Sequence, residues 1–249
     1  MYQTAFSLGA IQVHWYGILV AIATGISYWL TRRNVQAYGI EPDKTDGLLL
    51  KLIIVIFAGA RLAYVISKWD FFQANPWEII RTDHGGLGSH GAIIAALICG
   101  YYLTKKAGIP YWQLADAVTP ALPVGHIFVR LGNFINGELY GPPTNLPWGV
   151  NFPGTAGPAH PSQLYEILTS LIILPLALKW SAKPHYPGYA FVRVLLAHSV
   201  VRFFMDFLRQ PGQINSRLVL TQYIALGLAV FCAVLIWYWE KGNRAKLRL

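Results

Sequence analysis

The stretch Leu48-Leu-Leu-Lys51-Leu-Ile-Ile-Val-Ile-Phe-Ala-Gly-Ala-Arg61-Leu-Ala-Tyr-Val-Ile-Ser67 decides the class of fold. It holds only two charged side chains and has the length of about 20 residues that a helix needs to cross a bilayer. The whole chain of 249 residues is 55% hydrophobic and 12% charged, with a mean hydropathy of +0.41. Soluble domains carry about a quarter charged residues, so the composition indicates an integral membrane protein.

Comparable apolar runs recur along the chain and leave no room for a separate soluble domain. We therefore predict an all-α integral membrane fold, a single polytopic domain over residues 1–249 with seven transmembrane helices. Between the fourth and fifth helices, the polar segment 132–162, rich in Gly, Pro and Asn, is expected to form a small external cap. The expected transmembrane helices cover residues 13–31, 48–67, 87–104, 114–131, 163–180, 187–207 and 218–239.

The formal charge of +9 is spread over short loops rather than gathered in a basic block, so we expect no nucleic-acid partner. Cytoplasmic loops of membrane proteins are enriched in Lys and Arg. Eleven cations fall on one side of the predicted topology and four on the other, which predicts an external N-terminus and a cytoplasmic C-terminus. The eleven are Arg32, Arg33, Lys44, Lys105, Lys106, Lys179, Lys183, Lys241, Arg244, Lys246 and Arg248, and the four are Lys68, Arg81, Arg209 and Arg217.

The segment Arg130-Leu-Gly-Asn-Phe-Ile-Asn-Gly-Glu-Leu-Tyr-Gly141 places a cation, two amides and a carboxylate where the fourth predicted helix meets the external loop. A charge at the centre of a membrane helix costs about 2.5–3.5 kcal/mol on insertion scales, so such groups indicate function. Arg202 lies at a similar depth in the sixth predicted helix. Because guanidinium groups bind phosphate oxygens in a bidentate way, we expect a lipid phosphate between Arg130 and Arg202.

Internal pairing is the alternative for these two arginines. Glu138 follows Arg130 by eight residues, and Asp206 follows Arg202 by four, which is one helical turn on the same face. A further cation, Arg61, follows small residues that let another helix approach closely.

Three other polar groups lie near the predicted external surface. His90, in the glycine-rich run 85–91, is open to two interpretations, a proton acceptor or a hydrogen-bonded packing residue. Tyr16 belongs to a His-Trp-Tyr-Gly tetrad that is typical of an interfacial aromatic belt. The segment His160-Pro-Ser-Gln-Leu-Tyr-Glu166 is expected either to cap a helix or to contact a lipid head group.

These motifs resemble the bacterial prolipoprotein diacylglyceryl transferase family, in the family's order and over nearly the whole chain. The resemblance implies a transferase of the cell inner membrane, surrounded by membrane lipids, with its active site toward the outer leaflet. Such an enzyme moves the diacylglyceryl group of phosphatidylglycerol to the lipobox cysteine in the signal peptide of a prolipoprotein. A thioether forms and glycerol-1-phosphate leaves. Neither a metal nor another cofactor is expected.

The resemblance also assigns roles to residues. His90, Arg130 and Arg202 are the expected catalytic residues, with the two arginines on the phosphate. His198 stands where the family usually has Tyr, so it competes with His90 as the group that handles the thiol proton. Residues expected to bind the substrate, besides the two arginines, are Tyr16, Arg61, Asn133, Asn136, Glu138, Gly141, Gln163, Tyr165, Glu166, His198 and Asp206.

Two other functions stay open, and the first of them would use the same arginine pair. One is a phospholipid head-group hydrolase or transferase with a different acceptor. The other is a non-enzymatic phospholipid transporter.

Overall fold

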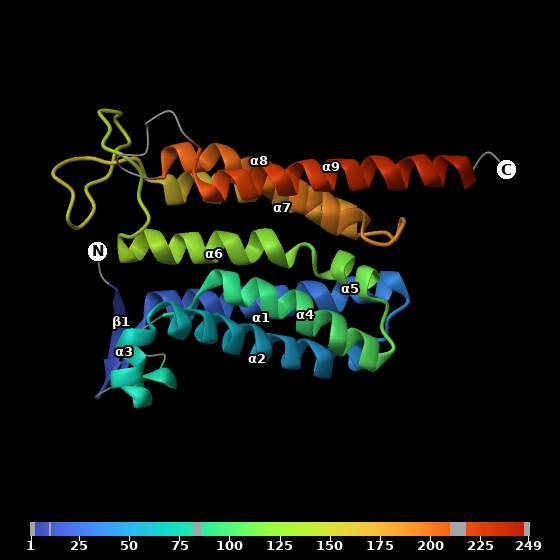
Figure 1. Cartoon of the computed structure of the whole chain (residues 1–249), viewed down its shortest axis with the longest axis horizontal. Coiled ribbons are helices and arrows are strands. Elements are labelled where there is room, and N and C mark those ends of the chain that lie inside the picture. The colour runs from blue at the N-terminus through green and yellow to red at the C-terminus, as the bar shows by residue number, and fades with distance from the viewer. Residues whose placement is uncertain (1–2, 10, 82–85, 210–217, 247–249) are drawn as a thin grey trace.

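The computed structural model describes residues 3–9, 11–81, 86–209 and 218–246, and within them long helices run side by side along the longest axis (Figure 1). Gly85, Arg217 and Arg248, which entered the sequence analysis, lie outside the described residues. The helical elements of the described residues are α1 (Trp15–Val35), η1 (Gln36–Tyr38), α2 (Pro42–Ser67), α3 (Trp69–Ala74), η2 (Pro76–Ile79), α4 (Ser89–Ala107), α5 (Tyr111–Val118), α6 (Ala121–Asn136), α7 (Ser162–Ser181), α8 (Tyr189–Met205), η3 (Asp206–Leu208) and α9 (Leu220–Lys246).

A short β-hairpin precedes the first helix and corrects the prediction of an all-α chain. Strand β1 (Thr4–Leu8) pairs antiparallel with β2 (Ile11–His14), with Thr4 opposite His14. Gly9 supplies a positive φ of 62° in the connection, a conformation that glycine adopts without steric cost. The strands are too short to give a clear alternating pattern, which is why sequence reasoning missed them.

The helices α2 and α4 pack against each other at unusually close range because glycines face each other. A Cβ added to Gly91 would lie 2.2 Å from the Gly59 carbonyl oxygen, and one added to Gly59 would lie 2.4 Å from Ala95 Cβ. Only residues without side chains allow two helix backbones to approach this closely. The start of α4, which carries His90, is thereby fixed against α2.

The predicted helix over 114–131 is divided between α5 and α6. Pro120 lies at the break and Pro123 in the first turn of α6, where a proline lacks only a donor that has no helical partner. The Asp116 carboxylate of α5 accepts hydrogen bonds from the backbone of Gly188 at 2.8 Å and of Ala190 at 2.9 Å. Asp116, shortly before the break, therefore caps the start of α8.

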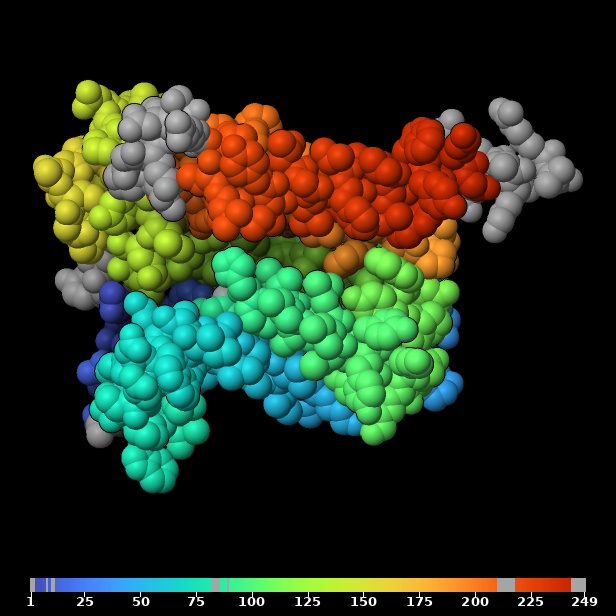
Figure 2. Space-filling model, viewed as in Figure 1, coloured from blue at the N-terminus to red at the C-terminus, as the bar shows by residue number. Residues whose placement is uncertain are grey.

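The helices form two groups with α6 between them (Figure 1). One group contains α1, α2 and α4, and the other contains α7, α8 and α9, while α6 packs on both α1 and α7. The space-filling view shows a furrow between α9 and α4 on this face (Figure 2).

Three helices of the described residues are long and apolar enough to cross a membrane, namely α2, α7 and α9 over Leu220–Gly242. The chain is therefore a helical membrane protein. The other predicted transmembrane ranges fall on α1, α4, α5 with α6, and α8, and the number seven remains a prediction.

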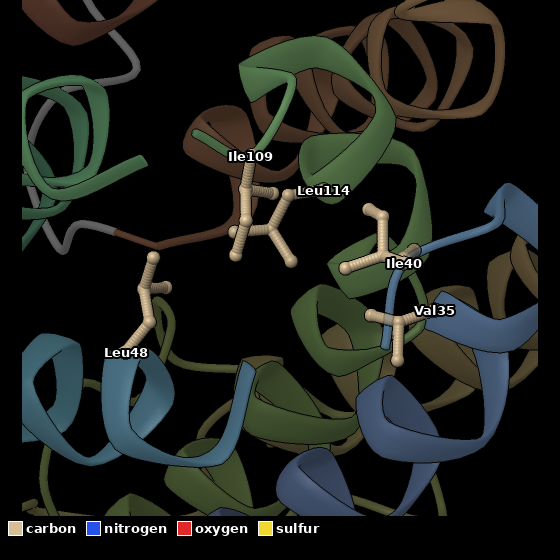
Figure 3. Packing of buried hydrophobic residues seen from close by; sticks show 6 residues of the cluster. Val35, Ile40, Leu48, Ile109 and Leu114 are labelled. Atoms are coloured by element: carbon tan, nitrogen blue, oxygen red, sulfur yellow. The ribbon is translucent and has the colours of Figure 1, made fainter. Parts of the chain in front are cut away.

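The two ends of the helical body differ. At one end, a buried apolar cluster of Val35, Ile40, Leu48, Ile109 and Leu114 joins the turns around α1, α2, α4 and α5 (Figure 3). The other end carries the hairpin, α3 and the irregular segment 137–161, which makes up most of the predicted cap (Figure 1).

Candidate functional site

A cavity of about 1970 Å³ lies between the two helix groups, at the end that carries the hairpin. Its wall draws on α1, α2, α4, α6, α7, α8 and α9, so segments far apart in sequence meet there. The lining includes most of the residues that the sequence predicted for the site: Tyr16, Arg61, His90, Arg130, Asn133, Asn136, Glu138, Glu166, His198 and Arg202.

The carboxylate of Glu166 is the centre of the charged side of this cavity. Its Oε2 lies 2.6 Å from Arg130 Nε and 3.1 Å from His126 Nε2, and its Oε1 lies 2.7 Å from Arg209 Nε. The Glu166 side chain is only 3% exposed, and each arginine side chain is 12% exposed. His126 is fixed in turn by a 2.8 Å hydrogen bond between its Nδ1 and Ser170 Oγ. One buried carboxylate thus ties together α6, α7 and the segment after η3.

Arg202 is held differently, within its own helix. Its Nη2 lies 2.8 Å from Asp206 Oδ1, one turn further on, and its side chain is 33% exposed. This is the pairing that the sequence spacing predicted, and it is confirmed. Arg202 also lies close enough to Arg130 and Glu166 to interact electrostatically with both.

Glu138 pairs with amides rather than with Arg130. Its Oε1 accepts hydrogen bonds from Asn133 Nδ2 at 3.0 Å and from Asn136 Nδ2 at 3.1 Å. Asn133 also accepts a 3.1 Å hydrogen bond from Arg130 Nη1 through its Oδ1. A chain of polar contacts therefore runs from the buried arginine to an exposed carboxylate at the mouth of the cavity.

The backbone next to Glu138 is strained and is held from α7. Leu139 has a positive φ of 62°, which is uncommon for a residue with a side chain. Ser162 Oγ donates to the Leu139 carbonyl at 2.8 Å, and Gln163 Nε2 donates to the Glu138 carbonyl at 2.7 Å. Both donors belong to buried side chains, so their contacts fix the position of Glu138.

Two glycines allow close contacts beside the site. A Cβ at Gly141 would lie 2.2 Å from the Leu208 carbonyl oxygen, so this position brings segment 137–161 against η3. A Cβ at Gly132 would lie 2.6 Å from the ring of Tyr16, so Tyr16 packs directly on α6. The tyrosine predicted for the site is positioned by the motif that carries Arg130.

Some of the predicted site residues lie behind the cavity wall rather than in it. The Tyr165 hydroxyl accepts a 2.9 Å hydrogen bond from Trp148 Nε1 and lies 3.1 Å from His160 Nδ1, within the segment that covers the site. The predicted residues outside the lining are Gly141, Gln163, Tyr165 and Asp206.

The opposite wall belongs to α2 and α4. His90 is exposed in the first turn of α4 and lines the cavity. The guanidinium of Arg61 also lines it, and it donates to backbone carbonyls of the connection that leads to α4. Those carbonyls belong to Glu78, Ile79, Arg81 and Gly86. Arg61 therefore holds the segment that precedes His90.

His198 lies deep in the charged wall, on the α8 side. Its ring meets the ring of His126 edge-on, with centroids 5.5 Å apart. It lines the same cavity as His90, but on the other wall. His90 and His198 both line the cavity, so both stay candidates for the group that accepts the thiol proton.

Sequence reasoning missed two residues of the site, His126 and Arg209. Both line the cavity and both contact Glu166. Their partner is on another helix, so no spacing in the sequence points to it. For Arg209, the available signals were its place close to the end of a helix that already carried Arg202 and its place in one of the motifs that carry the family resemblance.

The arrangement suits an anionic lipid. Three guanidinium groups and two imidazoles line one wall, while an exposed imidazole faces them from the other. Arginine is the side chain that best matches phosphate oxygens, and an imidazole near them can accept a proton.

Comparison with known proteins gives a consistent result. A model of the family described as "Prolipoprotein diacylglyceryl transferase" matches residues 3–238. A protein of Desulfotalea psychrophila is 35% identical over 252 residues, covering 94% of this chain and 91% of its own length. One of Methylococcus capsulatus is 36% identical over 213 residues, covering 83% of this chain and 81% of its own. Both relatives are named phosphatidylglycerol–prolipoprotein diacylglyceryl transferase.

A third relative, from Thermosynechococcus vestitus, has the same name and is 33% identical over 229 residues. This alignment covers 88% of the present chain and 85% of the relative. In all three pairs the similarity extends over most of both chains.

Proposed function

The chain belongs to the prolipoprotein diacylglyceryl transferase family, and we propose that it transfers the diacylglyceryl group of phosphatidylglycerol to the lipobox cysteine of prolipoproteins. The substrates in this proposal are the ones stated in the names of its relatives. The observation that carries the proposal to this chain is that Arg130, Arg202 and His90 all line one cavity.

The proposed reaction is one displacement at carbon. The cysteine thiolate attacks the diacylglyceryl carbon that bears the phosphate ester, a C–S bond forms, and the C–O bond breaks. The electron pair of that bond leaves with glycerol-1-phosphate. Because a free thiol has a pKa of about 8.5, deprotonation needs assistance at neutral pH, which His90 provides. The thiol proton passes to the imidazole.

Arg130 and Arg202 act on the phosphate in this proposal. Negative charge grows on the phosphate oxygens as the C–O bond breaks, and preorganised donors stabilise it more strongly in the transition state than in the bound lipid. The carboxylate partners of the two arginines orient them without excluding the phosphate. Support comes from the placement of both arginines in the cavity lining, with Arg202 still one-third exposed.

The head group of the lipid would lie nearer the mouth of the cavity. Tyr16, Asn133, Asn136 and Glu138 line this region, and their hydroxyl, amide and carboxylate groups match the two free hydroxyls of the glycerol. Three further predicted residues act indirectly in this proposal. Gly141, Gln163 and Tyr165 hold segment 137–161 over the site.

We also propose a topology for the whole chain as one polytopic unit. Seven helices would cross the inner membrane, with residues 132–162 as an external cap and the cavity opening toward the outer leaflet. The basic last turns of α1, α4 and α7 support this orientation, because Lys and Arg are enriched on the cytoplasmic side.

The test is incubation of the purified protein with phosphatidylglycerol and a lipobox peptide, followed by mass spectrometry. The proposal predicts a peptide heavier by one diacylglyceryl group, and no product with a Cys→Ser peptide. Lipid cleavage without peptide modification would instead identify a hydrolase. Unaltered lipid that moves between the leaflets of a vesicle would identify a transporter.

A further inference from the structure

We propose that Glu166 is a positioning residue that holds Arg130 and Arg209 as one phosphate-binding pair, so that Arg209 becomes a third arginine of the site. This inference rests on the proposed function, because it assigns the pair to the phosphate of the same lipid. It differs from the expectation that Glu166 contacts the lipid head group itself.

The geometry of the carboxylate divides its two oxygens between the two arginines. Oε2 lies 2.6 Å from Arg130 Nε, and Oε1 lies 2.7 Å from Arg209 Nε, both within ion-pair distance. Each contact uses the inner nitrogen of the guanidinium, so these ion pairs do not occupy the terminal nitrogens. One of them, Arg130 Nη1, reaches Asn133 at the head-group end of the cavity.

Charge explains why the pair needs this carboxylate. Two guanidinium groups side by side in a low-dielectric wall repel each other unless an anion lies between them. Glu166 supplies that anion when no lipid is bound, and it does so from a nearly closed position with 3% exposure. A phosphate that then approaches finds both cations already in place, which avoids the cost of ordering them in the transition state.

His126 adds a further contact to the carboxylate and accepts a 3.2 Å hydrogen bond from Arg130 Nε. His126 Nε2 approaches Oε2 at 3.1 Å, and its Nδ1 meets Ser170 Oγ at 2.8 Å, one helical turn beyond Glu166 on α7. Since both oxygens lie within ion-pair distance of an arginine and the side chain is only 3% exposed, Glu166 has little surface for a substrate. Its effect on the reaction must pass through the arginines.

Arg202 differs from Arg130 and Arg209 in its carboxylate partner and in its exposure. Its partner Asp206 lies one turn away on the same chain segment, and Arg202 keeps 33% of its side chain exposed. Arg130 and Arg209 are each 12% exposed and come from two different segments, and both contact Glu166. The bridged pair is therefore the fixed part of the phosphate site, and Arg202 is the part that adjusts.

The first experiment compares three variants in the peptide-transfer assay. Glu166→Gln keeps the size of the side chain but removes its charge, and it should lower kcat about 10²-fold with a much smaller change in KM. Glu166→Asp retains the charge and should recover part of the rate. The matched control is Glu240→Gln, which removes a carboxylate paired with Arg193 far from the cavity, and it should leave kcat unchanged.

The second experiment uses chemical rescue. Arg209→Ala should lose about 10²-fold in rate, and millimolar guanidinium should restore at least about tenfold by docking against the free oxygen of Glu166. Methylammonium should not restore it, because it lacks the planar fork. The double variant Arg209→Ala/Glu166→Gln should show no rescue. A merely structural arginine would give a loss that guanidinium does not repair.

The outcomes separate this inference from the proposed function. Product from the wild type together with full activity in Glu166→Gln or Arg209→Ala overturns the inference alone, as does an Arg209→Ala loss without rescue. If the wild type makes no thioether, the proposed function fails. The pair is then tested by native mass spectrometry of bound phosphatidylglycerol, where Glu166→Gln should retain about tenfold less lipid, and equal retention would overturn it.

Discussion

On the α6–α8 side of the cavity, buried charges hold one another in place, whereas on the α2–α4 side, glycines bring two helix backbones together. The first side, here called the arginine wall, consists of Arg130, Glu166, Arg202 and Arg209. The second, the glycine wall, is formed by His90, which lines the cavity, and by the contact of Gly59 with Gly91 that holds α4 against α2 behind it.

The two walls should respond to opposite kinds of change. The arginine wall is sensitive to removal, because a buried charge that loses its partner is strongly unfavourable. The glycine wall is sensitive to addition, because a single methyl group has no room between its helices. The comparison indicates that the protein fixes charge with charge on the side to which we assign the phosphate, and fixes position with backbone contact on the side to which we assign the proton acceptor.

The largest effect is expected when the arginine wall loses a cation. Arg130→Ala and Arg202→Ala should each lower the rate of thioether formation by about 10²–10³ or more, because each removes a donor to the leaving phosphate. The rate is measured by mass spectrometry of the lipobox peptide. Arg193→Ala, at the other end of the molecule, serves as the control for removing a buried arginine. Near-normal turnover of Arg130→Ala would show that the wall does not carry the phosphate.

The next largest effect should come from His90. His90→Gln keeps a polar side chain but removes the proton acceptor, and general-base catalysis typically contributes about 10²–10⁴ in rate. The loss should shrink as pH rises toward the thiol pKa of about 8.5, where the cysteine ionises by itself. Rates are therefore compared across pH. A loss that is the same at every pH would shift the proton-accepting role away from His90, with His198 as the remaining candidate.

A smaller effect is expected from adding one methyl group to the glycine wall. Gly91→Ala would place a Cβ 2.2 Å from the Gly59 carbonyl oxygen, so α4 has to move away from α2. Overpacking of this kind costs about 1–3 kcal/mol, and the displaced His90 should slow transfer about tenfold. Thermal unfolding in detergent and the transfer assay measure the two quantities.

The matched control for that change is Gly227→Ala on α9, where a Cβ meets nothing within 4 Å. It should change the stability by no more than about 0.5 kcal/mol. If both substitutions have the same effect, the close approach of α2 and α4 is not what positions the wall.

The smallest effect is expected at the support of the cap. Ser162→Ala removes the hydrogen bond to the Leu139 carbonyl, a contact worth about 0.5–1.5 kcal/mol. The rate should fall only a few-fold, because Gln163 still holds the adjacent carbonyl. Ser181→Ala, in the last turn of the same helix, provides the comparison. A loss as large as that of Arg130→Ala would mean that the cap matters as much as the arginine wall.

Sequence reasoning succeeded where the signal is local. The long apolar ranges fall on single helices except for 114–131, which is divided between α5 and α6, and the pair Arg202 and Asp206 is found as its spacing of one helical turn predicted. It failed where the partner lies on another helix. Arg130 has Glu166 as its carboxylate partner instead of the nearby Glu138, and Arg209 joins the same carboxylate.

The remaining differences also have physical causes. The hairpin at residues 4–14 is too short to give a periodic signal, and no sequence spacing shows that Asp116 accepts hydrogen bonds from the backbone of Gly188 and Ala190. For Arg61, the sequence could register a cation in an apolar helix. It could not show that the guanidinium holds the backbone of the connection to α4.

The most direct test of this account is the stoichiometry of the reaction. Glycerol-1-phosphate and the thioether peptide are quantified in the same time course, with wild-type protein, phosphatidylglycerol and the lipobox peptide. The account predicts that one molecule of glycerol-1-phosphate appears for each thioether, and that neither appears without the peptide. Phosphate release in the absence of the peptide, or folded protein that yields neither product, would contradict it.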